Sequence, residues 1–438
     1  MGGVTRRQIL ASASASLLPA ADARPNIVFI ISDDHHYQCL GAAGNPNVQT
    51  PNLDKLASRG VNFANANIST PQCAPSRGVL LSGLESYQTG LDCNSHLAFL
   101  RNQRPTIVEQ MRQGGYETSL AGKWHIQPSP AECGFSKAPL WKQPAAGPYR
   151  DPLLRRGIDG KDEKVSGHIT DLFTDAAIEV VRSAKQPYLL WLAYTAPHTP
   201  WSVDDKYRQL YAGKGDKLAP PAHPPGGSRF DWETYYAVIT HLDEAVGRLI
   251  VALESSGQWR KTLVVFLGDN GYLCGTKGLQ GKVEAWEESI RVPMIVSGGL
   301  TRGRGRLDAP VASVDLPATF LDFARVKPAG ALAGVSLRGE IETAKSRRTE
   351  SFAAWDDGRP EALLVPRAVE PYRTVRTRTH KLIVWKSGKQ MLFDLVSDSG
   401  ESNDLSTAAS QSNTLRQLRE KLVRRMRATS DPALAWMG

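Results

Sequence analysis

Continuous apolar runs, rich in β-branched and aromatic residues, recur along this chain, and segments with helical spacing separate them. Residues 27–31 form one such run, and residues 188–194 and 262–267 form two more. Short apolar runs without polar alternation are typical of strands that are buried on both faces of a sheet. Their alternation with helices predicts an α/β fold. We expect strands at residues 27–31, 116–121, 188–194, 262–267 and 293–296, and helices at residues 52–58, 106–113, 171–183, 231–255 and 314–323.

Two stretches interrupt this pattern. Residues 128–167 follow neither period, and residues 139–160 are rich in Pro, Gly and charge. Residues 213–228 contain four prolines. Long loops in an α/β enzyme often shape a substrate site, and disorder is the alternative. We therefore expect loops rather than strands or helices in both stretches.

Past residue 348 the composition shifts toward short strands, which we expect at residues 373–376, 381–385 and 391–395. A helix is expected at residues 412–427, with a basic face that we expect to be solvated. The sequence thus predicts a catalytic domain at residues 24–348 and a small C-terminal domain at residues 349–438.

The composition is that of an ordinary globular protein: 438 residues, 41% hydrophobic and 22% charged. The net charge of +9 suits acidic partners such as sulfated glycans, envelope surfaces or nucleic acid, but a charge of this size also serves solubility alone. No nucleic-acid-binding motif is present, so we expect no nucleic-acid partner. The chain contains no later stretch of about 18 apolar residues, so we expect no transmembrane segment.

The N-terminus carries a candidate export signal. Thr5-Arg6-Arg7-Gln8-Ile9-Leu10 resembles a twin-arginine signal and precedes a weakly apolar stretch. Ala21-Asp22-Ala23 fits a cleavage site of small residues. We expect a signal peptide at residues 1–23, export by the twin-arginine machinery, and a periplasmic or secreted protein. An uncleaved, frayed tail is the alternative.

Five cysteines are present: Cys39, Cys73, Cys93, Cys133 and Cys274. If Cys73 is modified, the other four could form disulfides in three possible pairings. Four buried free thiols are the alternative. We favour the free thiols, because proteins exported by the twin-arginine route fold first in the reducing cytosol.

Polar motifs follow four of the predicted strands. Asp33-Asp34, Lys123 with His125, His198 and Asp269-Asn270 each come just after a strand ends. In open α/β sheets, ligands bind at the carboxyl ends of the strands, so these motifs are expected to meet at one edge. Oxygen donors suit Ca²⁺ or Mg²⁺ rather than zinc. Taken alone, Asp33-Asp34 is equally typical of a turn or a helix cap, and Asp269-Asn270 of a turn.

Cys73-Ala74-Pro75-Ser76-Arg77 predicts a thiol at the start of a helix, where backbone N–H groups favour negative charge. Arg77 would lie one turn further along, on the same face as Cys73. The alternative is a structural cysteine at a helix start.

These residues and their order resemble the type I sulfatases of the alkaline phosphatase superfamily. The resemblance runs from about Arg24 to the C-terminal tail. It implies a large, mostly parallel sheet flanked by helices, and a small C-terminal domain with an antiparallel sheet and a helix. The motifs that carry it are Pro25–Asp34, Thr50–Ala57, Cys73–Arg77, Gly122-Lys123-Trp124-His125, Ala196–Pro200, Gly268–Gly271, Gly281-Lys282 and Arg291-Val292-Pro293.

The resemblance also implies a site chemistry. A formylglycine-generating enzyme would oxidise Cys73 to formylglycine, the nucleophile, beside a Ca²⁺ (or Mg²⁺) ion. The metal ligands would be Asp33, Asp34, Asp269 and Asn270, with the modified Cys73 next to the ion. Arg77 and Lys123 would steady the hydrated formylglycine, Lys282 and His198 would contact the sulfate, His198 would protonate the leaving alcohol, and His125 would help release the sulfate.

The expected activity is hydrolysis of a sulfate ester, with a sulfated carbohydrate as the substrate. A phosphonate monoester or phosphodiester hydrolase with the same nucleophile is one alternative, and a non-catalytic binding protein of the same fold is another. The sequence leaves open which sugar and ring position are involved, O- or N-sulfate, end or internal attack, and the oligomeric state.

Several residues near the expected site depart from the family pattern or have no assigned role. Lys277 stands where many relatives carry a His, Glu287-Glu288-Ser289 replaces a Gly-rich stretch, and His35-His36 follows the Asp pair. His35 and His36 are either substrate contacts or structural residues. Three aromatic residues, Trp124, Trp201 and Tyr272, would either stack on a sugar or pack in the core.

Overall fold

The computed structural model describes residues 24–95, 99, 104–143, 147–185, 187–221, 223, 229–356 and 368–437. The expected signal peptide, residues 1–23, lies outside the described residues, as does part of the proline-rich loop, residues 222 and 224–228. Among the described helices, none combines the length and apolar character needed to cross a membrane.

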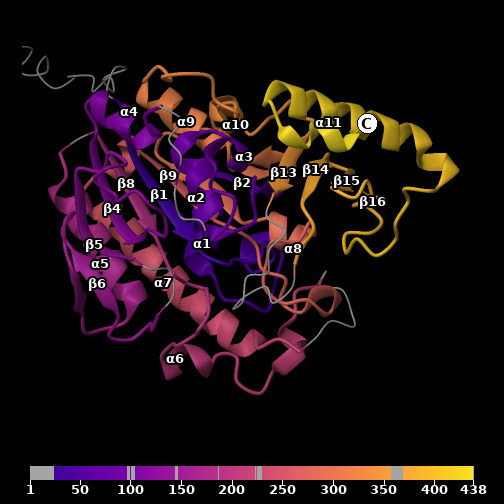
Figure 1. Cartoon of the computed structure of the whole chain (residues 1–438). Helices are drawn as coiled ribbons and strands as arrows, with labels where there is room; N and C mark the ends of the chain where they lie inside the picture. Colours follow the sequence, from indigo (N-terminus) through magenta and orange to yellow (C-terminus); the bar gives the residue numbers. More distant parts are fainter. Residues whose placement is uncertain are drawn as a thin grey trace, which may run out of the picture.

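A mixed sheet of ten strands organises the larger part of the molecule (Figure 1). From edge to edge the strands are β11 (Gly305–Leu307), β2 (Val61–Phe63), β10 (Met294–Gly298), β9 (Thr262–Gly268), β1 (Asn26–Ser32), β8 (Tyr188–Ala193), β4 (Glu117–Lys123), β5 (Lys137–Lys142), β6 (Leu153–Arg156) and β7 (Asp162–Lys164). Five neighbouring central strands are parallel. On one side β10 runs antiparallel to both of its neighbours, while the edge strand β11 is parallel to β2. On the other side β6 and β7 continue the sheet with antiparallel pairing. The predicted α/β fold is therefore confirmed.

The strand β1 shows why a continuous apolar run is needed at the centre of this sheet. Ile27, Phe29 and Ile31 point to one face, and Val28 and Ile30 point to the other, all fully buried. Two separate hydrophobic cores result, one on each side of the sheet. The first is covered by α2 (Cys73–Ser82), α4 (Ile107–Gln113), α9 (Asp315–Ala324) and α10 (Arg338–Thr343), and the second by α1 (Pro51–Ser58), α5 (Ile169–Ser183), α6 (Asp205–Arg208) and α7 (Trp232–Ser255).

The interruption expected at residues 128–167 is not a plain loop. It contributes β5, β6 and β7, which extend the sheet at one edge. The expectation fails because these strands are short and carry polar residues. Every residue of β7 is exposed, so no apolar run marks it.

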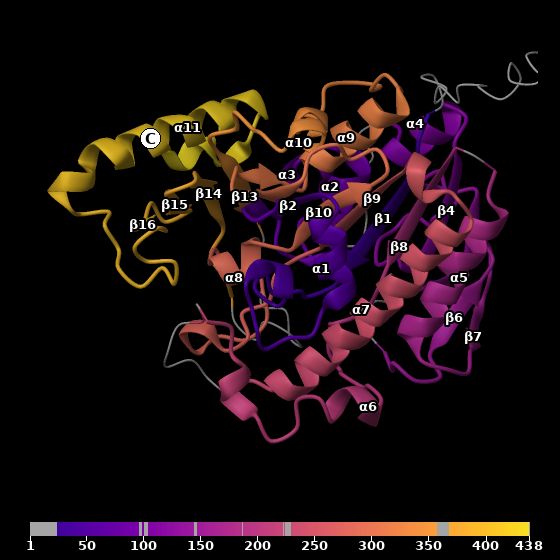
Figure 2. The ribbon, with the colours of Figure 1, turned by 180° about the vertical axis from the view of Figure 1, so that it is seen from behind.

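A second sheet of four antiparallel strands lies beside the large one: β13 (Ser351–Trp355), β14 (Tyr372–Arg376), β15 (His380–Trp385) and β16 (Gln390–Asp394). The helix α11 (Ser412–Ala428) covers one face of it (Figure 2). Its buried Leu418, Leu422 and Met426 recur every four residues, and this places them on the side that meets the sheet. The small antiparallel sheet with its helix is therefore confirmed, whereas a domain boundary at residues 348 and 349 stays a prediction.

Two short strands, β3 (Ala66–Asn67) and β12 (Val311–Ala312), pair with each other. Two short helices, α3 (Ser86–Thr89) and α8 (Glu287–Ile290), follow the segments that contain Cys73 and Lys282. All five cysteines are buried and free. This agrees with the free-thiol alternative for the four residues other than Cys73.

Candidate active site

The four polar motifs meet at the carboxyl edge of the parallel strands, as the sequence predicts. They follow β1, β4, β8 and β9, which are neighbours in the sheet. The helix α2 brings Cys73 and Arg77 to the same place, and Lys282 comes from the segment before α8. Hydrogen bonds and ion pairs link most of these side chains, and each is at most 8% exposed: Asp33, Asp34, Cys73, Arg77, Lys123, His125, His198, Asp269, Asn270 and Lys282.

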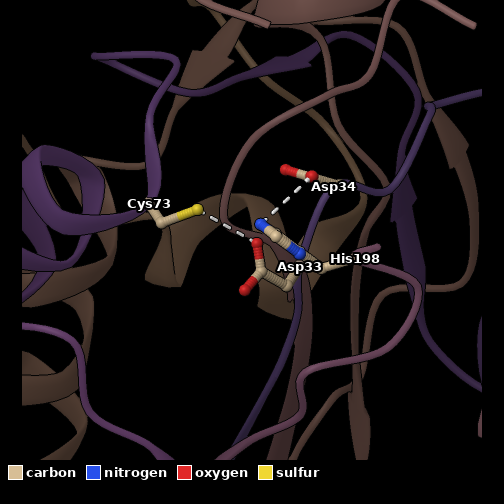
Figure 3. A group of neighbouring side chains, drawn as sticks. All are labelled: Asp33, Asp34, Cys73 and His198. Atoms are coloured by element: carbon tan, nitrogen blue, oxygen red, sulfur yellow. Dashed lines mark hydrogen bonds and ion pairs between the residues drawn. The ribbon is translucent and has the colours of Figure 1, made fainter. Parts of the chain in front are cut away.

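Cys73 is the first residue of α2 and faces the acidic residues (Figure 3). Its Sγ donates a hydrogen bond to Asp33 Oδ1 over 3.1 Å, and Lys282 Nζ donates to Sγ over 2.8 Å. Burial and the charge of Asp33 raise the pKa of the Cys73 thiol well above its usual value. The unmodified side chain is therefore a neutral thiol, which is a poorer nucleophile than a thiolate.

Three basic side chains are bound to the three carboxylates. Arg77 donates through Nε and Nη2 to Asp269 Oδ2, over 3.1 and 2.8 Å. Lys123 Nζ pairs with Asp33, and Lys282 Nζ lies 2.5 Å from Asp34 Oδ1. Three positive and three negative groups thus share a region closed to solvent, where such contacts are much stronger than in water.

Backbone geometry positions Lys123. The preceding Gly122 has a φ of 107°, and a Cβ at that position would lie 1.9 Å from the carbonyl oxygen of Ala193. Only glycine allows β4 to approach β8 this closely. The end of β4, and with it Lys123, is fixed beside the metal-ligand candidates on β1.

The two candidate catalytic histidines are both neutral. Burial and the charge of Lys123 lower the pKa of His125 well below its usual value, and burial lowers the pKa of His198. His198 Nε2 lies 3.7 Å from Asp34 Oδ2 (Figure 3). The Nδ1 atom of His125 is buried without a hydrogen-bond partner in the described part of the chain. Neutral imidazoles can accept protons.

Residues that sequence reasoning missed hold these histidines in place. Tyr149 donates its hydroxyl to the carbonyl oxygen of His198 over 2.7 Å, and Gln143 Oε1 accepts the backbone N–H of His125 over 2.8 Å. Asn94 accepts the backbone N–H of Ala74 over 3.0 Å, next to Cys73. No sequence signal marks these three residues, since Tyr149 and Gln143 lie in the stretch where the strand pattern breaks down.

The donor set fits a hard divalent cation. Within the described residues, Asp34 Oδ2, Asp269 Oδ1 and Asn270 Oδ1 are buried and have no hydrogen-bond partner. Leaving such oxygens unpaired is costly, and a cation that binds oxygen would satisfy them. Burial and the charge of Asp33 raise the pKa of Asp269 to about 7, and a cation would favour its ionised form. Ligand atoms of Asp33, Asp34, Cys73 and His198 lie within 4.8 Å of one another.

The departures from the family pattern have structural contacts. His35 is held between Ser32 Oγ, 3.0 Å from its Nδ1, and the carbonyl oxygen of Cys39, 3.2 Å from its Nε2. His36 stacks on Tyr37. Lys277 Nζ donates to the carbonyl oxygen of Gly400 over 2.9 Å, far along the chain. This contact therefore connects the segment before Lys282 to the segment that follows β16.

Glu287 and Glu288 belong to a second buried charge group, which we call the junction cluster: Glu287, Glu288, Arg376, Lys381 and Glu401. Glu287 lies 3.0 Å from Arg376 Nε and 3.3 Å from Lys381 Nζ, and so joins α8 to β14 and β15. This cluster therefore connects α8, which follows the Lys282 segment, to the small sheet.

The three aromatic candidates for sugar stacking have packing partners. Trp124 is buried and donates its Nε1 to the carbonyl oxygen of Pro128 over 2.8 Å. Tyr272 is buried and stacks on Tyr235. Trp201, which is half-buried, donates to the carbonyl oxygen of Pro197 over 2.5 Å. These contacts favour the core interpretation for Trp124 and Tyr272.

Comparison with known families gives two overlapping matches. Residues 25–326 match the sulfatase family, and residues 275–428 match the C-terminal region of N-sulphoglucosamine sulphohydrolase. This protein belongs to the sulfatase family. The resemblance seen in the sequence is thereby confirmed, and the enzyme is a sulfuric ester hydrolase.

Two characterised relatives illustrate how this sulfatase relates to the family. It is 30% identical to the ulvan-active sulfatase of Formosa agariphila over 406 residues, which cover 87% of this chain and 77% of that protein. It is 25% identical to the N-acetylglucosamine-6-O-sulfatase of Bacteroides thetaiotaomicron, covering 91% of this chain and 86% of that protein.

Solved structures share the fold of this sulfatase. BT4656, in complex with its substrate D-glucosamine-2-N,6-O-disulfate, superposes with a TM-score of 0.82 at 23% identity, covering 93% of this chain and 99% of that one. The phosphonate monoester hydrolase of Agrobacterium radiobacter superposes with a TM-score of 0.73 at 22% identity, covering 94% and 97%. At these identities the likeness concerns the fold alone.

Proposed function

We propose that this sulfatase hydrolyses a sulfate ester of a sulfated saccharide, with formylglycine made from Cys73 as the nucleophile and Ca²⁺ (or Mg²⁺) as the cofactor. One observation carries the proposal: Cys73 Sγ lies in hydrogen-bond contact with Asp33 and Lys282, beside buried oxygens that have no partner in the described structure. The saccharide is supported by the two relatives, whose names specify ulvan and N-acetylglucosamine-6-O-sulfate as targets.

Formylglycine, once formed, supplies a hydrated aldehyde with one hydroxyl to attack sulfur and a second to allow release of sulfate. The divalent cation supplies positive charge next to it. The residues that would hold the cation are Asp33, Asp34, Asp269 and Asn270. Their two unpaired carboxylate oxygens and one unpaired amide oxygen support this assignment.

The basic side chains have separate tasks in this proposal. Arg77 and Lys123 hold Asp269 and Asp33 and keep positive charge on the α2 side of the site. Lys282 contacts the position of the Cys73 side chain directly and would bind a sulfate oxygen there. Fixed positive charge of this kind stabilises the negative charge that develops as the S–O bond breaks.

The histidines would move protons. His198 lies beside the acidic pair, within 4.8 Å of Cys73 between ligand atoms, and would protonate the leaving alcohol (Figure 3). Since neutral His198 must first gain that proton, a bound sulfate and the adjacent Asp34 would support its charged form. His125, held neutral, would accept a proton during the release of sulfate.

Maturation and location are also part of the proposal. A formylglycine-generating enzyme would modify Cys73, and the twin-arginine machinery would export the protein to the periplasm or beyond. The paired arginines Arg6 and Arg7 support this route. The catalytic domain would comprise residues 24–348 and the small domain residues 349–438.

The decisive experiment combines chemistry and specificity. Mass spectrometry of the peptide containing Cys73, from a host that makes the modifying enzyme, should show an aldehyde in place of the thiol. Cys73→Ala should lower the hydrolysis of an aryl sulfate by about 10⁴-fold or more and leave the melting temperature near that of the parent. Cys133→Ala, at another buried cysteine, should retain parental kcat/KM in whatever fraction folds.

Paired assays then separate the two hydrolase activities. We expect a higher kcat/KM on aryl sulfate than on the matching aryl phosphonate ester. A higher value on the phosphonate would replace the proposed activity with phosphonate monoester hydrolysis. Parent-level activity in Cys73→Ala would refute the nucleophile itself.

A further inference from the structure

A groove lies where residues 346–349, the turn between β14 and β15, and α11 meet. Its volume is about 550 Å³. Of the twelve side chains that line it, five are basic or histidine, five carry a hydroxyl group, and none is acidic. Arginine and hydroxyl groups together are suited to bind oxyanions, because both donate hydrogen bonds to them.

Two of the arginines in this groove are free to bind a ligand. Arg348 is held by Asp315 and Glu340, at 3.1 and 3.2 Å, and Lys421 is held by Glu350. By contrast, the exposed Arg347 and Arg378 have no ion pair or side-chain hydrogen bond within the described part of the chain. Two of the four arginine and lysine charges of the groove are therefore uncompensated.

The basic character continues around α11. This helix carries six basic residues and one acidic residue, so it contributes five of the nine net positive charges of the chain. Arg424 and Arg427 line a second cavity of about 680 Å³ on the helix, and neither makes a side-chain hydrogen bond or a close ion pair among the described residues. We call Arg347, Arg378, Arg424 and Arg427 the C-terminal basic surface.

This surface is separate from the ten buried side chains of the candidate active site, which we call the catalytic cluster: Asp33, Asp34, Cys73, Arg77, Lys123, His125, His198, Asp269, Asn270 and Lys282. One face of the small sheet, with Trp355 and Ile383, packs against Val283 and Ala285, which lie one and three residues after Lys282. The opposite face packs against α11. The small sheet therefore stands between the two sites, and the groove shares no lining residue with the catalytic cluster.

The structure favours one class of polyanion as the ligand. No aromatic side chain except His380 lines either cavity, so neither offers a platform for stacking nucleic-acid bases. The apolar face of α11 is buried against the sheet and is not available to insert into a membrane. Sulfate groups, by contrast, match spaced guanidinium groups with neighbouring hydroxyls.

We propose that the C-terminal basic surface is a second, non-catalytic binding site for a sulfated polysaccharide. It holds the polymer chain while the catalytic site acts on one sulfate ester. The proposal rests on the proposed function for the identity of the polymer. The binding itself depends only on the unpaired arginines.

The test measures the affinity of the full-length, matured enzyme for dextran sulfate, with unsulfated dextran as the ligand control. Two variants remove two charges each: Arg347→Gln/Arg378→Gln and Arg424→Gln/Arg427→Gln. The matched control, Arg302→Gln/Lys327→Gln, removes two exposed charges from the large domain. Each surface variant should weaken binding about tenfold and reduce its salt dependence, and the control should change affinity less than about twofold.

Activity on a small aryl sulfate separates this inference from the proposed function. Both surface variants should keep the parental kcat/KM on that substrate. Equal binding by the surface variants and the control would overturn the inference and leave the proposed function standing. If the parent enzyme binds dextran sulfate and the surface variants lose that binding, but the parent hydrolyses no sulfate ester, the proposed function alone would be overturned.

Two further ligands test the class of polymer. Duplex DNA of matched charge and vesicles rich in acidic phospholipid should bind more weakly than dextran sulfate. Equal or tighter binding of either one, lost in the same variants, would overturn the assignment to a sulfated polysaccharide.

Discussion

Two clusters of buried charge lie a few residues apart along the chain, the catalytic cluster around Lys282 and the junction cluster around Glu287. In the junction cluster, Glu287 has Arg376 and Lys381 as partners, and despite burial these charges hold its pKa below the usual range. In the catalytic cluster, one oxygen each of Asp34, Asp269 and Asn270 has no hydrogen-bond partner among the described residues. Glu288 Oε2 of the junction cluster also lacks one, but the raised pKa of that carboxyl keeps it protonated. The paired charges of Glu287 connect α8 to the small sheet, whereas three unpaired oxygens gathered in one place indicate a ligand.

Removal of the cation should produce the largest difference between the clusters. Chelation of the matured enzyme should reduce the hydrolysis of aryl sulfate to about 1% or less, because the positive charge that the cation supplies next to the nucleophile is then lost. Ca²⁺ or Mg²⁺ should restore activity and raise the melting temperature, since a ligand bound only by the native state stabilises it. Restoration by Zn²⁺ alone would contradict the oxygen-ligand assignment.

Asp34→Asn tests the catalytic cluster one residue at a time. We expect kcat/KM to fall by about 10²-fold or more at limiting Ca²⁺, because a charged ligand is lost. A Ca²⁺ titration of activity should show a weaker apparent affinity than in the parent. Unchanged activity and unchanged Ca²⁺ dependence would remove Asp34 from the proposed ligand set.

Glu287→Gln should give the reverse result. It leaves the buried Arg376 and Lys381 without their shared carboxylate, so the free energy of unfolding should fall by about 3 kcal/mol. The folded fraction should keep a kcat/KM within about threefold of the parent. Denaturant unfolding measures the first quantity.

The control for that variant is Glu350→Gln, whose partner Lys421 is about a quarter exposed. Its effect on unfolding should stay below about 1 kcal/mol. If kcat/KM of the folded Glu287→Gln fraction falls by more than about threefold, Glu287 also affects catalysis and the two clusters are not distinct.

The smallest expected effect concerns Glu288 and pH. Burial and the charge of Glu401 raise the pKa of Glu288 to about 8, so the native protein keeps this group protonated where the unfolded chain has lost its proton. The contribution to stability is complete below about pH 4.5 and is lost as the pH rises through about 8. Melting temperatures at pH 6 and pH 9 measure the loss, on the order of 1–3 kcal/mol.

Glu288→Gln should reduce this pH dependence, because an amide has no proton to lose. Glu340→Gln, at a surface-side carboxylate bound to Arg348, serves as the comparison and should leave the slope between pH 6 and pH 9 unchanged. A parental slope in Glu288→Gln would show that another group titrates.

The sequence predicts the centre of this fold better than its edge. β1, β8 and β9 are buried on both faces, and a continuous apolar run is the direct consequence. The edge strands β6 and β7 are largely exposed to solvent, so their sequences show neither an apolar run nor a regular alternation of apolar and polar residues. β13 also escaped prediction, because its five residues, Ser351–Trp355, carry no turn signal or long apolar run.

The same distinction holds for the site. Cys73, Arg77 and the acidic pairs were predictable because spacing or position after a strand identifies them. Tyr149 and Gln143 act through contacts made only after folding, over 49 and 18 residues of sequence separation. The contact of Lys277 with Gly400 spans 123 residues and could not be inferred from its neighbours.

The position of β1 in the sheet has a consequence for biosynthesis. This first strand pairs only with β8 and β9 in the described structure, whose residues 189 and 262 align with Ile27 and Asn26. At about 5–20 residues per second, the ribosome needs roughly 10–50 s to make the intervening chain. During that interval Cys73 has no sheet edge to be buried against, and a modifying enzyme in the cytosol would find it accessible. Native burial of Cys73 then ends that period of access.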